Sequence, residues 1–259
     1  MIERTSANRD QVEVAGVPVD VVDRVAAQRW ILKAVESQPR PGLRLSTVNL
    51  DYLVLAERSR DFRLALRTTQ LAVADGTPVL WLARLAGRRL PERVAGSDLT
   101  DWLISGGVPS AKLYLLGSTE AVCRAVARRA DAAGVTVSGW NTSPPDVFND
   151  PEQSAALVAE INAGKPDVLL VALGAPRQEL WLRRHQPSLD VSVMMGIGGS
   201  LDIAAGRVRR APRFIQRIGL EWAFRMVQEP GRLFRRYLVD DLPFLVRVAL
   251  ASMSRKSPS

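Results

Sequence analysis

From about residue 44 onward, short apolar runs alternate with segments that have the length and amphipathic pattern of helices. This alternation is typical of a parallel sheet whose strands are connected by crossover helices. Most of these runs are short and continuously apolar, as strands covered on both faces should be. The predicted strands are Arg44–Leu50, Leu71–Ala74, Lys112–Leu116, Val135–Trp140, Asp167–Leu173 and Val191–Met195. We therefore expect an α/β fold with a Rossmann-like, mostly parallel sheet flanked by helices.

Local signals place some boundaries within this pattern. One helix is expected to begin where Asn149 or Asp150 can cap it and Pro151 can occupy its first turn. Near the N-terminus, the apolar segment Val12–Val22 contains Gly16, which suits a tight turn. We expect a small hairpin there, ahead of the first long helix.

The overall composition limits the class of protein. The chain has 259 residues, of which 47% are hydrophobic and 24% charged, and this balance is typical of a globular protein with its own core. The single cysteine, Cys123, cannot form an internal disulfide, so a reducing compartment is the simplest setting. The N-terminal segment has no apolar run behind its charges, as a signal peptide would, and no stretch approaches the length of a membrane span. We expect a cytoplasmic protein.

The excess positive charge is confined to the C-terminal part of the chain. Residues 1–206 contain 23 Lys or Arg and 23 Asp or Glu, whereas residues 207–259 contain 12 and 4. Apolar residues recur every four positions in the latter part, at Phe214, Ile218 and Trp222, which predicts amphipathic basic helices. This pattern favours a catalytic domain over 1–206 and a basic helical appendage over 207–259. The appendage would bind an anionic partner, or it is only a solubilising surface.

Ligands of open parallel sheets bind beyond the carboxyl ends of the strands, so the loops that follow the predicted strands are the first candidates for a site. Glycine in such loops lets a ligand approach the backbone, and a helix N-terminus offers N–H groups to a phosphate. Four loops have this character: Ala74-Asp75-Gly76, Leu116-Gly117-Ser118, residues 173–179 starting Leu-Gly-Ala-Pro, and residues 195–200 with the sequence Met-Gly-Ile-Gly-Gly-Ser.

Polar side chains at the first of these strand ends could carry chemistry. Asp75 ends an apolar strand, where partial burial favours accepting a proton, although a turn aspartate that stabilises its own backbone fits equally well. Thr47 and Asn49 lie two residues apart on a predicted strand and could hold one polar ligand together. Alternatively, they hydrogen-bond the next loop, or Asn49 caps the helix that starts near Tyr52.

The sequence motifs of several other classes of enzyme and binding site are missing. Gly196 and Gly198 lack the third glycine of a dinucleotide fingerprint, and no phosphate-binding P-loop sequence is present. His185 is the sole histidine and has no ligands at metal-binding spacing, so we expect a surface residue and no zinc site. Cys123 falls inside a helical pattern, as a buried inert thiol would. A Gly-x-Ser-x-Gly elbow is also missing, which disfavours a hydrolase.

Taken together, the motifs resemble those of the WecG/TagA/CpsF glycosyltransferases, also known as glycosyltransferase family 26, over most of the chain. The residues that carry the resemblance are Thr47-Val-Asn49, Ala74-Asp75-Gly76-Thr77-Pro78, Glu92-Arg93-Val94-Ala95-Gly96-Ser97-Asp98, Leu116-Gly117, Leu173-Gly174-Ala175-Pro176-Arg177-Gln178-Glu179-x-Trp181, Gly196-Ile197-Gly198-Gly199-Ser200-x-Asp202, Gly206, Arg210-Ala211-Pro212, Gly219-Leu220-Glu221-Trp222-x-x-Arg225 and Glu229-Pro230-x-Arg232.

The resemblance implies an inverting transfer of a sugar, of the N-acetylmannosamine type or another hexose, from a UDP-sugar to a sugar on a polyprenyl diphosphate. The product would enter a cell-envelope polysaccharide. It implies an enzyme at the cytoplasmic face of the membrane, with the C-terminal appendage covering the site and contacting anionic lipid.

The resemblance also implies roles for particular residues. Asp75 resembles the general base, Thr47 and Asn49 resemble groups that position the acceptor or the base, and Arg93 resembles a group that fixes the substrate. With no Asp-x-Asp dyad, we expect no metal and no cofactor. The leaving UDP would be held by backbone N–H groups and by arginines. The expected substrate-binding residues are Gly76, Gly117, Gly174, Gln178, Gly196, Gly198, Gly199, Arg207, Arg210, Arg213 and Arg217.

Competing functions predict different features. A nucleic-acid-binding module would need aromatic residues interleaved with basic ones on a surface element. Residues 1–206 are neutral overall and have no excess positive charge for binding nucleic acid, so we expect no nucleic acid partner. A nicotinamide oxidoreductase would bind its cofactor at Gly196–Gly199. A non-catalytic, membrane-associated subunit of a polysaccharide assembly complex would use the same basic appendage as an anchor. The oligomeric state stays open, a homo-oligomer included.

Overall fold

The computed structural model describes residues 9–142, 148, 150–212, 215, 221–228, 231 and 236–254. Its centre is a parallel sheet of six strands in the order β4-β3-β8-β7-β5-β6. The strands are β3 (Leu43–Val48), β4 (Leu71–Ala74), β5 (Lys112–Gly117), β6 (Thr136–Asn141), β7 (Val168–Ala172) and β8 (Val193–Gly196). The predicted α/β class and all six predicted strands are confirmed, with shifts of up to two residues at their ends.

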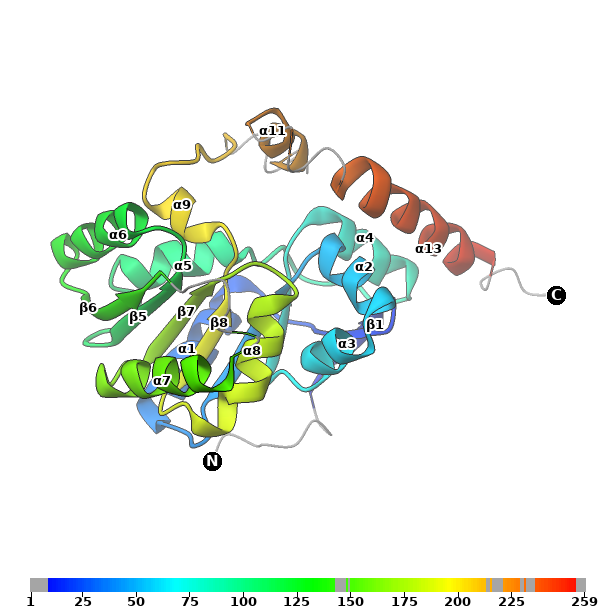
Figure 1. The fold of residues 1–259 in the computed structure, drawn as a ribbon. Coiled ribbons are helices and arrows are strands. Elements are labelled where there is room, and N and C mark those ends of the chain that lie inside the picture. Colours follow the sequence, from blue (N-terminus) through cyan, green and yellow to red (C-terminus); the bar gives the residue numbers. More distant parts are fainter. Residues whose placement is uncertain are drawn as a thin grey trace.

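Helices cover both faces of this sheet (Figure 1). One face carries α1 (Arg24–Ser37), α5 (Gly96–Ile104), α6 (Glu120–Ala132) and α9 (Ser200–Ala204), and the other carries α2 (Leu50–Arg58), α3 (Arg60–Arg67), α7 (Pro151–Ala163) and α8 (Arg177–His185). α4 (Thr77–Leu85) and the 3-10 turn η3 (Gln186–Ser188) complete this body. Asp150 caps α7 and Pro151 begins it, as the sequence predicts, whereas Asn149 lies outside the described residues.

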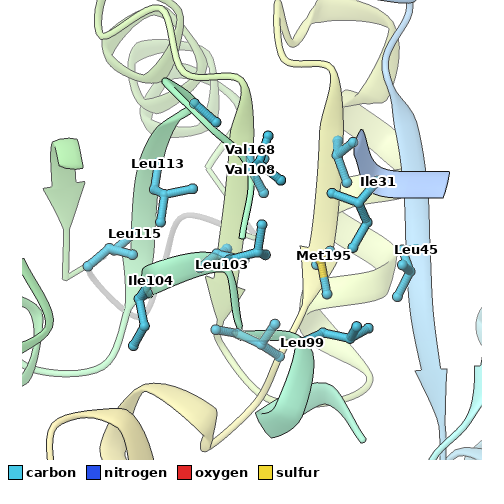
Figure 2. Packing of buried hydrophobic residues seen from close by; sticks show 14 of the residues in the cluster. Ile31, Leu45, Leu99, Leu103, Ile104, Val108, Leu113, Leu115, Val168 and Met195 are labelled. Carbon is cyan, nitrogen blue, oxygen red and sulfur yellow. The ribbon is translucent and has the colours of Figure 1, made fainter. Parts of the chain in front are cut away.

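The core follows from the alternation of side chains along each strand. Leu113 and Leu115 of β5 point to the face covered by α5 and α6, whereas Tyr114 and Leu116 point to the face covered by α7. Figure 2 shows the first of these layers, in which Leu103 of α5 packs among residues from β5, β7 and β8. Burial on both faces explains why most positions of the central strands are apolar.

The N-terminal hairpin is also confirmed, with β1 (Gln11–Val14) and β2 (Val17–Asp20). Ala15 and Gly16 both have positive φ, which gives the two-residue turn that matches strand twist. Asp20, nearly fully buried, accepts a hydrogen bond of 2.7 Å from the backbone N–H of Ala72 in β4. This contact attaches the hairpin to the edge of the sheet.

The described part of the C-terminal appendage is irregular over 207–212 and helical beyond it. It contains α11 (Glu221–Gln228), a π-helical turn η4 (Arg236–Asp241) and α13 (Leu242–Ser254). In Figure 1, α11 and α13 lie on the side of the molecule where α9, α4 and α2 also lie. The buried side chain of Phe244 packs in the cluster formed by α2, α3 and α4, which joins α13 to the body.

Candidate active site

The carboxyl ends of β3 and β4 bring Thr47 and Asp75 to one side of the sheet. The two strands pair in parallel, with Thr47 opposite Val73, so Thr47, Val73 and Asp75 all point to the same face. The N-terminus of α5 lies there, and Thr47 Oγ1 would be 3.1 Å from a Cβ added to Gly96. Thr47 and Asp75 therefore both lie against the first residue of α5.

Asp75 is held in place without being fully buried. Its Oδ2 accepts a hydrogen bond of 3.2 Å from the backbone N–H of Gly96, and its own N–H donates to the carbonyl of Val48 at 2.7 Å. A quarter of its side chain is exposed. The carboxylate is thus oriented by backbone contacts and still reachable by a substrate, as a base that takes a proton from an acceptor must be.

Arg93 lies at the centre of a group of charged residues beside Asp75. Its guanidinium is 4.0 Å from Asp75 Oδ1, 3.6 Å from Asp98 Oδ2 and 2.6 Å from Glu221 Oε2. Arg210 pairs with the other oxygen of Asp98. Two guanidinium groups are thereby held among three carboxylates, at a place where they could also receive the phosphates of a substrate.

The same group of charges joins the body to the appendage. Glu221 is the first residue of α11, and Arg210 follows α9, so both lie in the segment 207–259 that the charge pattern separates from the body. Asp98 and Glu221 each belong to a motif of the family resemblance, but the sequence predicts no role for either. Their pairing with arginines could not be found from the sequence, because Glu221 and Arg93 are 128 residues apart.

Asn49 has a different position from that of Thr47. Its Oδ1 accepts a hydrogen bond of 3.0 Å from the backbone N–H of Tyr52, so it is the N-cap of α2. The alternative interpretation of Asn49 as a helix cap is therefore confirmed, and β3 ends at Val48 instead of Leu50 because the chain turns into α2 there. Thr47 remains in the strand, and 5% of its surface is exposed.

Gln178 lies beneath the loops that follow β7 and β8, and 1% of its surface is exposed. Its Oε1 accepts hydrogen bonds from the backbone N–H groups of Gly174 and Gly198, at 3.1 and 3.2 Å. Two of the glycine N–H groups expected to face a phosphate therefore bind a side chain of the protein itself.

The other glycines of the predicted site have distinct surroundings. Gly76 has a φ of +112° and precedes α4, which begins with Thr77 and Pro78. A Cβ on Gly117 would overlap the backbone of Ala172, and a Cβ on Gly196 would overlap Glu179. Gly199 is the N-cap residue of α9. At Gly117 and Gly196, close packing inside the protein requires glycine, whatever the loops bind.

The remaining predicted residues are distributed along the appendage and elsewhere. Arg207 is exposed just after α9, whereas Arg213 and Arg217 lie outside the described residues. His185 is half-buried at the end of α8, which corrects the expectation of a surface residue. Cys123 is fully buried, as predicted. Within the described ranges, no three His, Cys, Asp or Glu side chains gather as metal ligands.

A buried carboxyl group, Glu179, is the strongest electrostatic anomaly near the site. Burial raises its pKa to about 7, although hydrogen bonds from Tyr52 and Gln178 and the charge of Arg44 act in the opposite direction. Tyr52 donates its hydroxyl to Glu179 Oε1, and the pKa of this tyrosine is raised well above its usual value by burial and by Glu179. Sequence patterns did not point to Tyr52 as part of the site.

The titration of Glu179 predicts how stability depends on pH. Because its pKa is higher in the folded protein than in the unfolded chain, folded protein holds this proton more tightly, and stability falls as pH rises from about 4.5 to about 7. We expect the free energy of unfolding of wild type to lose about 3 kcal/mol relative to Glu179→Gln over this range. Urea unfolding at pH 4, 6 and 8 measures it, with the exposed Glu152→Gln as control. Parallel pH profiles for wild type and Glu179→Gln would contradict the prediction.

The chain also matches a known protein family. The model of the Glycosyl transferase WecG/TagA/CpsF family matches residues 12–258. The match begins in the N-terminal hairpin and ends beyond α13, so it includes the charged group around Arg93 and its partner in α11.

Proposed function

We propose a specific transfer reaction for this chain, which belongs to the Glycosyl transferase WecG/TagA/CpsF family and is a glycosyltransferase. In this reaction a sugar of the N-acetylmannosamine type or another hexose passes from a UDP-sugar to a sugar on a polyprenyl diphosphate, with inversion at the anomeric carbon. The product serves the synthesis of a cell-envelope polysaccharide. The observation that carries the proposal is the partly exposed Asp75 carboxylate, oriented by Gly96 and adjacent to Arg93.

In the proposed mechanism Asp75 acts as the general base. Its carboxylate takes the proton of the acceptor hydroxyl while that oxygen attacks the anomeric carbon from the side opposite the nucleotide. The new glycosidic bond forms as the bond to the UDP oxygen breaks, and UDP leaves as the anion. Thr47, at the adjacent strand end, helps to position the acceptor, and Asn49 fixes the end of β3 as the cap of α2.

The negative charge that develops on UDP requires stabilisation. Arg93 and Arg210 are adjacent to Asp75 and Asp98, and we assign them to substrate phosphates, together with the appendage arginines Arg207, Arg213 and Arg217. These guanidinium groups take the role that a divalent cation has in many sugar transferases. We therefore expect transfer to proceed in EDTA.

The appendage also offers a surface for a lipid bilayer. Leu242, Val246 and Leu250 recur every four residues on α13 and are exposed, Leu250 to 61%, whereas Phe244 on another face of the helix packs against the body. Within the described residues, no helix is long and apolar enough to cross a membrane. An exposed apolar stripe on a helix of a basic segment suits a peripheral contact with anionic lipid at the inner face of the membrane.

A substitution in this stripe should weaken membrane binding. We expect Val246→Glu combined with Leu250→Glu to reduce binding to phosphatidylglycerol vesicles at least tenfold, because each apolar side chain transferred from water contributes roughly 1.5–3 kcal/mol. Vesicle flotation measures the bound fraction. The matched control, Val25→Glu with Leu64→Glu, places the same charges at exposed apolar positions of the body and should bind as wild type does. Equal binding by the α13 variant would refute this membrane contact.

The reaction itself is tested by identifying its product. The protein is incubated with a panel of UDP-sugars and a lipid-linked N-acetylglucosamine diphosphate, and the lipid product is examined by mass spectrometry and proton NMR. The proposal predicts an acceptor that is heavier by one sugar, with the anomeric configuration opposite to that of the donor. A product that keeps the configuration of the donor would exclude the single displacement with Asp75 as base.

A further inference from the structure

Two loops at the carboxyl edge of the sheet are tied together by one buried side chain. Gln178 Oε1 accepts one hydrogen bond from the loop that follows β7, at Gly174, and another from the loop that follows β8, at Gly198. Neither glycine would meet an atom within 4 Å if it carried a Cβ, so both points of the loops are open on that side. The carboxamide of Gln178 is therefore a specific connection between them.

The orientation of this carboxamide is fixed from its other end. Gln178 Nε2 donates to Tyr52 Oη at 2.8 Å and to Glu179 Oε1 at 2.7 Å. A rotated carboxamide would direct its NH₂ group at two backbone N–H donors and its oxygen at the Glu179 carboxylate, losing at least the hydrogen bonds to Gly174, Gly198 and Glu179. Tyr52 and Glu179 thus determine that the oxygen of Gln178 faces the glycines.

The cluster lies directly below the strand that leads into the second loop. A Cβ on Gly196 would overlap Glu179 Oε1 and approach Gln178 Nε2 to 2.6 Å, so the backbone of β8 rests on these polar atoms. Tyr52 reaches the cluster from α2 and packs edge-to-face on Phe62, with a centroid separation of 5.3 Å. A displacement of Tyr52 or Glu179 would therefore be transmitted to the loops through Gln178.

We propose that Tyr52 and Glu179 are positioning residues for the donor nucleotide, acting through Gln178 to hold the loops at Gly174 and Gly198 in their binding geometry. This inference rests on the proposed transfer from a UDP-sugar and on the expectation from the sequence that the loops after β7 and β8 lie against the UDP part of the donor. Gln178 itself acts from inside the protein, and the loop backbone makes the contacts with UDP. Because the loops are already ordered before UDP binds, less conformational entropy is lost on binding and the affinity for UDP is higher.

The test compares two tyrosines that each donate to a glutamate. Tyr52→Phe removes the hydroxyl beneath the loops. Tyr114→Phe removes the hydroxyl that donates to Glu160 on α7 and does not change the hydrogen bonds of Gln178. UDP binding is measured by calorimetry, and amide exchange of Gly174 and Gly198 by NMR. We expect Tyr52→Phe to weaken UDP binding and to speed both exchange rates about tenfold, and Tyr114→Phe to change neither more than twofold.

A conservative change at Glu179 provides the rescue arm. Glu179→Gln keeps a carbonyl oxygen that can accept from both Tyr52 and Gln178, so it should bind UDP within threefold of wild type, whereas Glu179→Leu should resemble Tyr52→Phe. Unchanged exchange at Gly174 and Gly198 in Tyr52→Phe would overturn the inference, as would unchanged UDP affinity or a wild type that does not bind UDP. UDP binding without product from any acceptor would overturn only the proposed function.

Discussion

Asp75→Asn is expected to lower kcat for sugar transfer by about a thousandfold, because a general base contributes roughly 10²- to 10⁴-fold to such a step. The amide has nearly the same size and can still accept the hydrogen bond from Gly96, but it cannot take a proton from the acceptor. UDP affinity and the free energy of unfolding should stay close to those of wild type. Steady-state rates with a saturating lipid-linked acceptor, together with UDP calorimetry, separate these effects.

The matched control for this substitution is Asp101→Asn. Asp101 lies at the exposed surface of α5 and pairs with Arg129 at 2.6 Å, so Asp101→Asn removes the same charge without affecting the proposed base. Its kcat should remain within twofold of wild type. If Asp75→Asn retains more than a tenth of wild-type kcat, another group must accept the proton.

Gly117→Ala should cost about 3 kcal/mol of stability, because two penalties combine at this position. The φ of Gly117 is +97°, which disfavours any side chain, and a Cβ would lie 2.6 Å from the carbonyl oxygen of Ala172 in the neighbouring strand. For a chain of this size the melting temperature should fall by about 10 °C. Thermal unfolding followed by circular dichroism measures the shift.

Gly87→Ala separates the two penalties. Gly87 has nearly the same φ, +93°, but a Cβ there would meet no atom within 4 Å. This control should lose only about 1 kcal/mol, the backbone cost alone. Equal losses for the two variants would show that the overlap with Ala172 does not determine why β5 ends in glycine.

Much of the fold could be predicted from local patterns. Short, mostly apolar runs that alternate with helical patterns predicted all six strands of the sheet, and Gly16 predicted the hairpin turn. Burial on both faces selects apolar residues, and positive φ selects glycine. The end of β3 was misplaced by two residues, since an apolar run that continues into a capped helix looks the same as a longer strand. Asn49 marks that boundary only once its hydrogen bond to Tyr52 is known.

The arrangement of the site was harder to predict, since its contacts join distant segments. The position at a strand end indicated Asp75, and the family resemblance indicated Arg93, but the partners of Arg93 come from α5 and α11. Arg44 is another example, as a charged residue buried within an apolar strand. Its guanidinium donates to the Ala65 carbonyl at 3.0 Å and to Gln186 at 2.7 Å, and no periodic sequence pattern predicts these partners.

The most direct test of the account is the release of UDP by wild-type protein in EDTA, with and without the lipid-linked acceptor. The account predicts that one donor of a UDP-sugar panel releases UDP at least a hundredfold faster when the acceptor is present, with no divalent cation. No acceptor-dependent release from any donor, even with magnesium and anionic vesicles added, would contradict the claim that this site transfers a sugar to a lipid-linked acceptor.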